Sequence, residues 1–253
     1  MKVKAAVRYQ IKALIPDILA IYLIITAIYM ASTIWAAVSL SSFEEGWTTV
    51  GGTEMIAVIF TFVAGITNFR PNFLFLMQNG LGRRQIIKSQ VATAAGASFI
   101  LAVASVIFDE IGAWISSHLH NFSFSNMILE LYGESLGDNS LIVRLAFTLC
   151  LMFAVYLAAY AFGYLLGVLG YRGGTPVIIG MSIGIPVLLF MALPIVISKL
   201  SEGMQNKLAN FFANTLLGVG IHQPWRGCLT FLAVTLILGA FGTWLASRAQ
   251  VKE

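Results

Sequence analysis

Long apolar runs alternate with short polar ones along this chain, at a spacing typical of a protein that crosses a membrane several times. A spanning helix needs about 20 largely apolar residues. Runs that reach or approach this length predict six transmembrane helices, at about residues 14–38, 54–69, 87–117, 141–170, 175–197 and 225–246. The pattern therefore predicts an all-α, polytopic membrane protein with a single transmembrane domain over residues 1–253.

Two of the segments outside these runs are amphipathic rather than plainly polar. Residues 1–12 carry four basic residues and no acid, which predicts a helix lying on the membrane surface with Val3, Ala6 and Val7 toward lipid. Residues 199–223 place leucine and phenylalanine at helical spacing, with asparagine and glutamine between them. We expect one or two short amphipathic helices there, at the outer interface.

The most informative segment is residues 69–88, FRPNFLFLMQNGLGRRQIIK. Pro71 fits the first turn of a helix, where its missing N–H has no partner to lose. One face of that helix would carry three apolar residues, Phe73, Leu76 and Met77. Gly80 then ends the helix, and Arg83 and Arg84 begin the next run. This pattern predicts a short amphipathic helix, a turn and a basic anchor, with an ordinary positively charged loop as the alternative.

The distribution of basic residues predicts the orientation of the chain. Six spans put both termini on one side, and eleven of the fifteen Lys and Arg residues then share that side with the 69–88 segment. They are Lys2, Lys4, Arg8, Lys12, Arg70, Arg83, Arg84, Lys88, Arg172, Arg248 and Lys252. Because cytoplasmic loops carry the excess of Lys and Arg, we expect cytoplasmic termini.

Composition narrows the function classes further. Hydrophobic residues make up 58% of the chain and charged residues only 10%, against about 25% in a soluble domain. So low a charge density argues against binding nucleic acid, which needs a basic face. The two cysteines, Cys150 and Cys228, lie in or beside apolar runs and support neither a disulfide framework nor a metal site.

Two adjacent acids lie within the third predicted span. Asp109 and Glu110 follow Lys88 by about 32 Å of helix, close to one hydrocarbon thickness. We therefore place them at the outer interface, with an intramembrane proton or cation site as the alternative. The chain contains neither GxxxxGK[ST] nor HExxH, and we predict no catalytic, cofactor or metal site of its own.

The predicted topology and the stretch Phe75–Lys88, FLMQNGLGRRQIIK, resemble the membrane permease of ABC-2 type transporters, a family of bacterial ABC exporters. The stretch is similar to the family's Gly-x-[Ser/Gly]-Arg-[Arg/Lys] element ahead of span three, with Gly82 where many members carry Ser. The resemblance implies a multi-pass protein of the bacterial cytoplasmic membrane, in contact with lipid. It also implies a second permease subunit, identical or a sister chain, and a separate ATP-binding subunit that holds ATP and Mg.

The resemblance further implies a role for the 69–88 segment. Its helix would be the coupling helix, seated in a groove of the ATP-binding subunit. The residues implied in docking are Phe73, Leu76, Met77, Gly80, Arg83 and Arg84. ATP hydrolysis by the partner would then drive export of a substrate such as a peptide, an antibiotic or a lipid.

Two other readings of the sequence stay open. One is a secondary carrier or channel that is not driven by ATP, and the other is a membrane-embedded enzyme or assembly factor. The scarcity of charged residues in the middle of the predicted spans favours the ATP-driven permease, because ion-coupled carriers use ionisable groups near the bilayer midplane.

Overall fold

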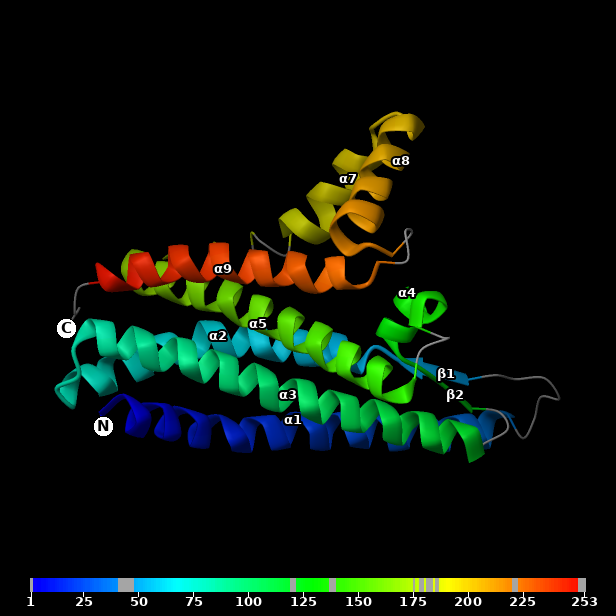
Figure 1. Cartoon of the computed structure of the whole chain (residues 1–253), viewed down its shortest axis with the longest axis horizontal. Helices are drawn as coiled ribbons and strands as arrows, with labels where there is room; N and C mark the ends of the chain where they lie inside the picture. Colours follow the sequence, from blue (N-terminus) through cyan, green and yellow to red (C-terminus); the bar gives the residue numbers. More distant parts are fainter. Residues whose placement is uncertain are drawn as a thin grey trace.

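The computed structural model describes residues 2–40, 48–118, 122–136, 140–174, 176–177, 180, 184, 187–219 and 223–249. Most of them are helical (Figure 1). In chain order the elements are α1 (Lys2–Leu40), β1 (Thr48–Gly51), α2 (Thr53–Gln78), α3 (Arg83–His118), β2 (Phe122–Ser125), α4 (Met127–Leu136), α5 (Leu141–Gly173), η1 (Leu188–Ala192), α7 (Leu193–Ser198), α8 (Glu202–Asn210), η2 (Phe211–Leu217) and α9 (Trp225–Ser247).

Five helices within the described residues are long and apolar enough to cross a membrane: α1, α2, α3, α5 and α9. They coincide with five of the six predicted spans, and this architecture is that of a multi-pass membrane protein. The remaining predicted span, 175–197, lies partly outside the described residues. Its described part contains η1 and α7.

Helix α5 is the centre of the bundle, because α2, α9 and α3 all pack against it, while α1 packs mainly on α3 (Figure 1). The α2–α5 contact depends on glycine. A Cβ atom added to Gly65 would lie 2.5 Å from the Tyr160 carbonyl oxygen, and one added to Gly167 would lie 2.7 Å from that of Ile66. Small residues let two helices approach this closely in lipid, so the glycines serve helix packing.

Helix α1 differs from its predicted form. It begins at Lys2 and runs without a break, so residues 2–12 do not form a separate surface helix. Ala6, Gln10, Leu14 and Ile18 recur every four residues and are all buried against the bundle. This face continues the core-facing stripe of the span, which explains why the basic segment extends the helix.

A pair of short strands was not predicted. β1 and β2 are parallel, in a register that runs from Thr48 opposite Phe122 to Gly51 opposite Ser125. Both lie at the end of the bundle where α2 begins (Figure 1). Because backbone groups near a membrane surface still need partners, two loop segments that meet there pair with each other. The fold is therefore helical apart from one strand pair.

The segment after α5 projects away from the other helices. In Figure 1, α7 and α8 stand out from the bundle. α8 and η2 confirm the short helices predicted within residues 199–223. The wide turn η1 lies directly before Pro194, which cannot donate the usual backbone hydrogen bond. None of the described residues of α7, α8 or η2 is buried.

Candidate functional site

The bundle has two distinct ends. At one of them α1 begins, α2 turns into α3, and α5 and α9 finish (Figure 1). We call it the basic end, because many basic residues gather there, among them Lys4, Arg8, Lys12, Arg70, Arg83, Arg84, Lys88, Arg172 and Arg248. The opposite end, with β1, β2 and α4, we call the acidic end.

A well-formed turn closes α2 at the basic end. Gly80 adopts φ 73° and its N–H donates to the Met77 carbonyl at 3.0 Å, while the Leu81 N–H donates to the Leu76 carbonyl at 3.1 Å. These two bonds define a Schellman motif, in which glycine occupies the left-handed position. The predicted break at Gly80 is therefore confirmed. Gly82 directly precedes α3, and its carbonyl accepts the Ile86 N–H at 3.0 Å.

The helix start predicted at Pro71 is wrong, because α2 passes through this residue without interruption. Phe69 and Phe73 lie on either side of the proline, and their rings stack with centroids 5.4 Å apart. Both rings also contact Tyr171 of α5 edge-on. These contacts hold the helix on both sides of the lost hydrogen bond, so the segment predicted as a separate helix forms the last turns of α2.

Two of the predicted docking residues face inward. The exposed fraction is 0% for Phe73 and 3% for Leu76, and Met77 packs against the same core. Phe69, Phe73 and Leu76 form one stripe that α2 presents to the bundle. The apolar face that indicated a groove-binding helix is therefore occupied by the chain's own core, and Phe73 and Leu76 are not accessible to a partner in this conformation.

Other aromatic side chains are exposed at the same end. Phe75 of α2 is 42% exposed and Tyr9 of α1 is 47% exposed. Their rings stack with centroids 4.7 Å apart and an angle of 21° between planes. We call this pair the Tyr9–Phe75 surface. Of the remaining predicted docking residues, Arg83 and Arg84 are exposed in the first turn of α3, and Gly80 is exposed in the turn before it.

The acidic end contains a buried carboxyl group. Asp109 is 5% exposed, whereas the neighbouring Glu110 is exposed. The amide nitrogen of Asn126 donates to Asp109 Oδ2 at 2.7 Å. The amide oxygen of Asn126 accepts the Ile128 N–H at 2.8 Å. Asn126 therefore caps the start of α4 and holds Asp109 with the same side chain.

A second buried acid reaches the same helix start. Glu54, in the first turn of α2, is 4% exposed, and its Oε1 accepts the Met127 N–H at 3.0 Å. That N–H is one of the donors that a helix cannot satisfy internally. Two acids from α2 and α3 thus bind consecutive residues at the start of α4. The dipole of each helix favours a negative charge near its N-terminus, where Glu54 lies.

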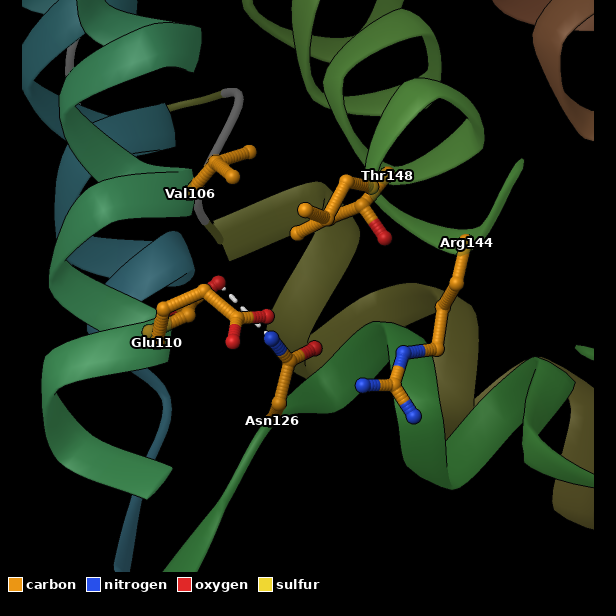
Figure 2. Close-up of a pocket in the computed structure, with 7 residues that line it drawn as sticks. Val106, Glu110, Asn126, Arg144 and Thr148 are labelled. Atoms are coloured by element: carbon orange, nitrogen blue, oxygen red, sulfur yellow. Dashed lines mark hydrogen bonds between the residues drawn. The ribbon is translucent and has the colours of Figure 1, made fainter. Parts of the chain in front are cut away.

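A small cavity opens beside Asp109 (Figure 2). Its volume is about 10 Å³, close to the space that one water molecule needs. It is lined by Val106, Asp109, Glu110, Asn126, Arg144, Leu145 and Thr148. Figure 2 shows the hydrogen bond to Asn126 and the Arg144 side chain extending from α5 toward the same space. The cavity therefore combines acid, amide, hydroxyl and guanidinium groups.

Two further groups of hydrogen-bonded polar side chains join helices of the bundle. Ser105 lies 2.7 Å from the Tyr22 hydroxyl and 2.6 Å from that of Tyr156, which joins α1, α3 and α5. Closer to the basic end, Thr93 donates to Gln10 Oε1 at 2.5 Å, which joins α3 to α1. Buried polar groups in lipid must bond to one another, so these side chains fix the mutual placement of the helices.

The sequence indicated Asp109 and Glu110 but missed the partners that the structure brings to Asp109. Glu54 stands alone before an apolar run, and nothing in that pattern shows which helix it will contact. Asn126 carried a usable signal, because an asparagine directly before a helical pattern is a preferred N-cap. No set of three His, Cys, Asp or Glu side chains converges as a metal site within the described part of the chain.

Comparison with known proteins adds no relative: no protein-family model, no curated protein and no solved structure matches this chain. The function must therefore be argued from the residues and their arrangement.

Proposed function

We propose that this chain is the membrane permease subunit of an ABC-2 type transporter, which exports its substrate when a separate ATP-binding subunit hydrolyses ATP. The observation that carries the proposal is the basic end. There, the sharp α2–α3 turn at Gly80, the exposed Arg83 and Arg84, and the Tyr9–Phe75 surface lie on one end of a multi-pass bundle. This is the end that the excess of basic residues assigns to the cytoplasm.

The buried positions of Phe73 and Leu76 change the docking residues of this proposal. The Tyr9–Phe75 surface takes their place, since stacked and partly exposed aromatic rings make effective anchors in a partner's pocket. Arg83 and Arg84 would bind acidic groups at the rim of that pocket or lipid phosphates. Because the two rings come from α1 and α2, a partner that binds both would act on two helices together.

The packing suggests how force at this surface would reach the rest of the bundle. α2 contacts α5 closely at Gly65 and Gly167, so the two helices cannot slide past one another without separating. A displacement of the α2 end would therefore carry α5 with it. In the proposed transporter, a second permease subunit would complete the path of a lipophilic or amphipathic cargo between the two chains.

The experiment is affinity purification of the tagged chain from its native membrane in a mild detergent, followed by mass spectrometry. We expect a soluble protein with a P-loop in stoichiometric amount. The double substitution Tyr9→Ala and Phe75→Ala should remove this protein. Trp225→Ala is the matched control, because Trp225 is an exposed aromatic residue at the opposite end of the bundle. A stable chain that purifies without any ATPase would contradict the proposal.

A second candidate, a carrier that is not driven by ATP, is favoured by one observation: the buried acids Glu54 and Asp109. Ionisable groups within membrane proteins often lie on proton or ion pathways. The two candidates differ in reconstituted vesicles. The carrier would move its substrate down an ion gradient without nucleotide, whereas the permease would need both its partner and ATP.

A further inference from the structure

Glu54 and Asp109 are brought together by two neighbouring residues. Asn126 donates its side-chain amide to Asp109, and Met127, the next residue, donates its backbone N–H to Glu54. The two carboxyl groups therefore flank a single point, the start of α4. Both side chains are at least nine-tenths buried, so water cannot screen them well.

Among the described residues, the charged and titratable groups nearest Asp109 do not supply a matching positive charge. Tyr22 from α1 and Tyr156 from α5 reach Ser105, one turn from Asp109, and both are neutral phenols in hydrogen-bonded contacts. Glu110 on the cavity rim adds a third acid. Arg144 lines the cavity from α5, but among the described residues no ion pair joins it to Asp109 or Glu110.

The two side-chain oxygens of Asp109 differ in their hydrogen bonding. Oδ2 accepts from Asn126, but Oδ1 is buried and has no hydrogen-bond partner within the described part of the chain. An ionised carboxylate this deeply buried would need a cation or several donors to offset its charge, and Asn126 supplies a single neutral amide. A neutral carboxyl group differs, because one oxygen carries its own hydrogen and can donate to a water in the adjoining cavity. The unpaired oxygen thus points to a protonated acid.

We propose that Glu54 and Asp109 form a proton-binding pair that holds one exchangeable proton, carried by Asp109. Glu54 keeps the negative charge, because it lies at the start of α2 and accepts an N–H from the start of α4. No other described acid or histidine completes a three-ligand metal site here, which makes a proton a better occupant than a metal ion. The inference does not depend on the transport proposal.

Loss of this proton would act on α4. Two negative charges would then face each other across the Asn126–Met127 step and repel. α4 is tied in turn to the projecting segment, since the Tyr132 hydroxyl donates to the Leu217 carbonyl of η2 at 2.8 Å. Burial raises the pKa of Tyr132, so this phenol stays a donor when the pair titrates. The proton is thereby linked to the placement of α4 and η2.

Infrared spectroscopy of the purified full chain in lipid nanodiscs tests the proposal directly. Near pH 7, exposed acids are ionised, and a protonated buried carboxyl group gives a separate C=O band. We expect this band in the wild-type chain and its loss in Asp109→Asn. Glu202→Gln is the control, because Glu202 is an exposed acid of α8 that does not line the cavity, and this variant should keep the band. A wild-type chain without the band, or a band that survives in Asp109→Asn, would overturn the proposal.

Thermal unfolding gives an independent readout. Acids of the unfolded chain are ionised above about pH 4, so a proton retained in the folded state makes folding less favourable as pH rises. The unfolding constant should rise by up to tenfold per pH unit for one proton. Asp109→Asn imitates the neutral acid and should fold, with this dependence removed. Equal pH dependence in both chains would contradict the pair, as would a Ca²⁺- or Na⁺-dependent stabilisation that Asp109→Asn abolishes, because the compensating ion would then be a metal.

Discussion

The two ends of this bundle handle charge in opposite ways. At the basic end, Arg83 and Arg84 are exposed, and the turn between α2 and α3 satisfies its own backbone through the Gly80 motif. At the acidic end, Glu54 and Asp109 are buried and bind the start of α4. An exposed charge contributes little to stability, whereas in a buried polar network the loss of any one hydrogen-bond partner lowers stability. The basic end is therefore suited to a partner, and the acidic end to holding the fold.

The largest effect on stability should come from the close contact between α2 and α5, which joins the two ends of the bundle. A Cβ atom at Gly163 would collide with the Phe62 carbonyl of α2, which a side-chain rotation cannot relieve. We expect Gly163→Ala to lower the free energy of unfolding by about 3 kcal/mol. Gly239→Ala in α9 is the control, because open space surrounds Gly239, and better helix propensity should make it neutral or slightly stabilising. Unfolding in detergent, followed by fluorescence, measures both.

The next largest loss of stability is expected when an asparagine is replaced by alanine at the acidic end, compared with the same substitution at the basic end. Asn126→Ala removes the cap of α4 and the donor to buried Asp109, which should cost about 2 kcal/mol. At the basic end, the exposed Asn79 donates only to the Phe75 carbonyl of its own helix. Asn79→Ala should change the unfolding free energy by less than about 0.5 kcal/mol. Equal losses at the two positions would remove the contrast.

A smaller loss is expected at Ser105, which joins Tyr22 and Tyr156. Ser105→Ala should lower the unfolding free energy by about 1–2 kcal/mol, because the buried Tyr156 hydroxyl and the partly buried Tyr22 hydroxyl each lose a partner. Ser117, on the same helix, is exposed and bonds only within its own helix, to the Trp114 carbonyl and the His118 ring. Ser117→Ala is therefore the control, and the thermal midpoint should stay within error of the wild type. A Ser105 variant with unchanged stability would show that the hydrogen bonds linking α1, α3 and α5 contribute no net free energy to folding.

The smallest effect concerns the turn of the basic end. Gly80→Ala places a side chain at φ 73°, which should cost about 1 kcal/mol although space around Gly80 is open. Gly82→Ala, two residues later, has the same open space without the left-handed backbone and should be close to neutral. If the two variants melt together, the Schellman turn contributes nothing to stability.

Much of this fold follows from local patterns. Apolar runs predicted the five long helices, and Gly80 marked the end of α2, because these features depend on neighbouring residues alone. The failures depend on contacts across the fold. Pro71 indicated a helix start, but the stacking of Phe69 and Phe73 against α5 carries α2 through it.

The candidate sites were less predictable for the same reason. Phe73 and Leu76 share an apolar face, and a face of that kind fits a partner's groove as well as the chain's own core. Only the position of α5 decides between them. The pairing of Asp109 with Glu54 joins residues 55 positions apart through a third segment at Asn126 and Met127, and no local pattern contains that information.

The claim that the two ends face opposite sides of a membrane, with the basic end in the cytoplasm, can be measured directly. In a chain with Cys150 and Cys228 replaced by alanine, Gln78→Cys marks the basic end and Ser140→Cys marks the acidic end, and both positions are exposed. A membrane-impermeant maleimide is applied to intact cells that produce the chain and to inverted vesicles made from them. We predict that position 140 reacts in cells and position 78 reacts only in inverted vesicles. Labelling of both positions from one side, or the reverse assignment, would contradict the account.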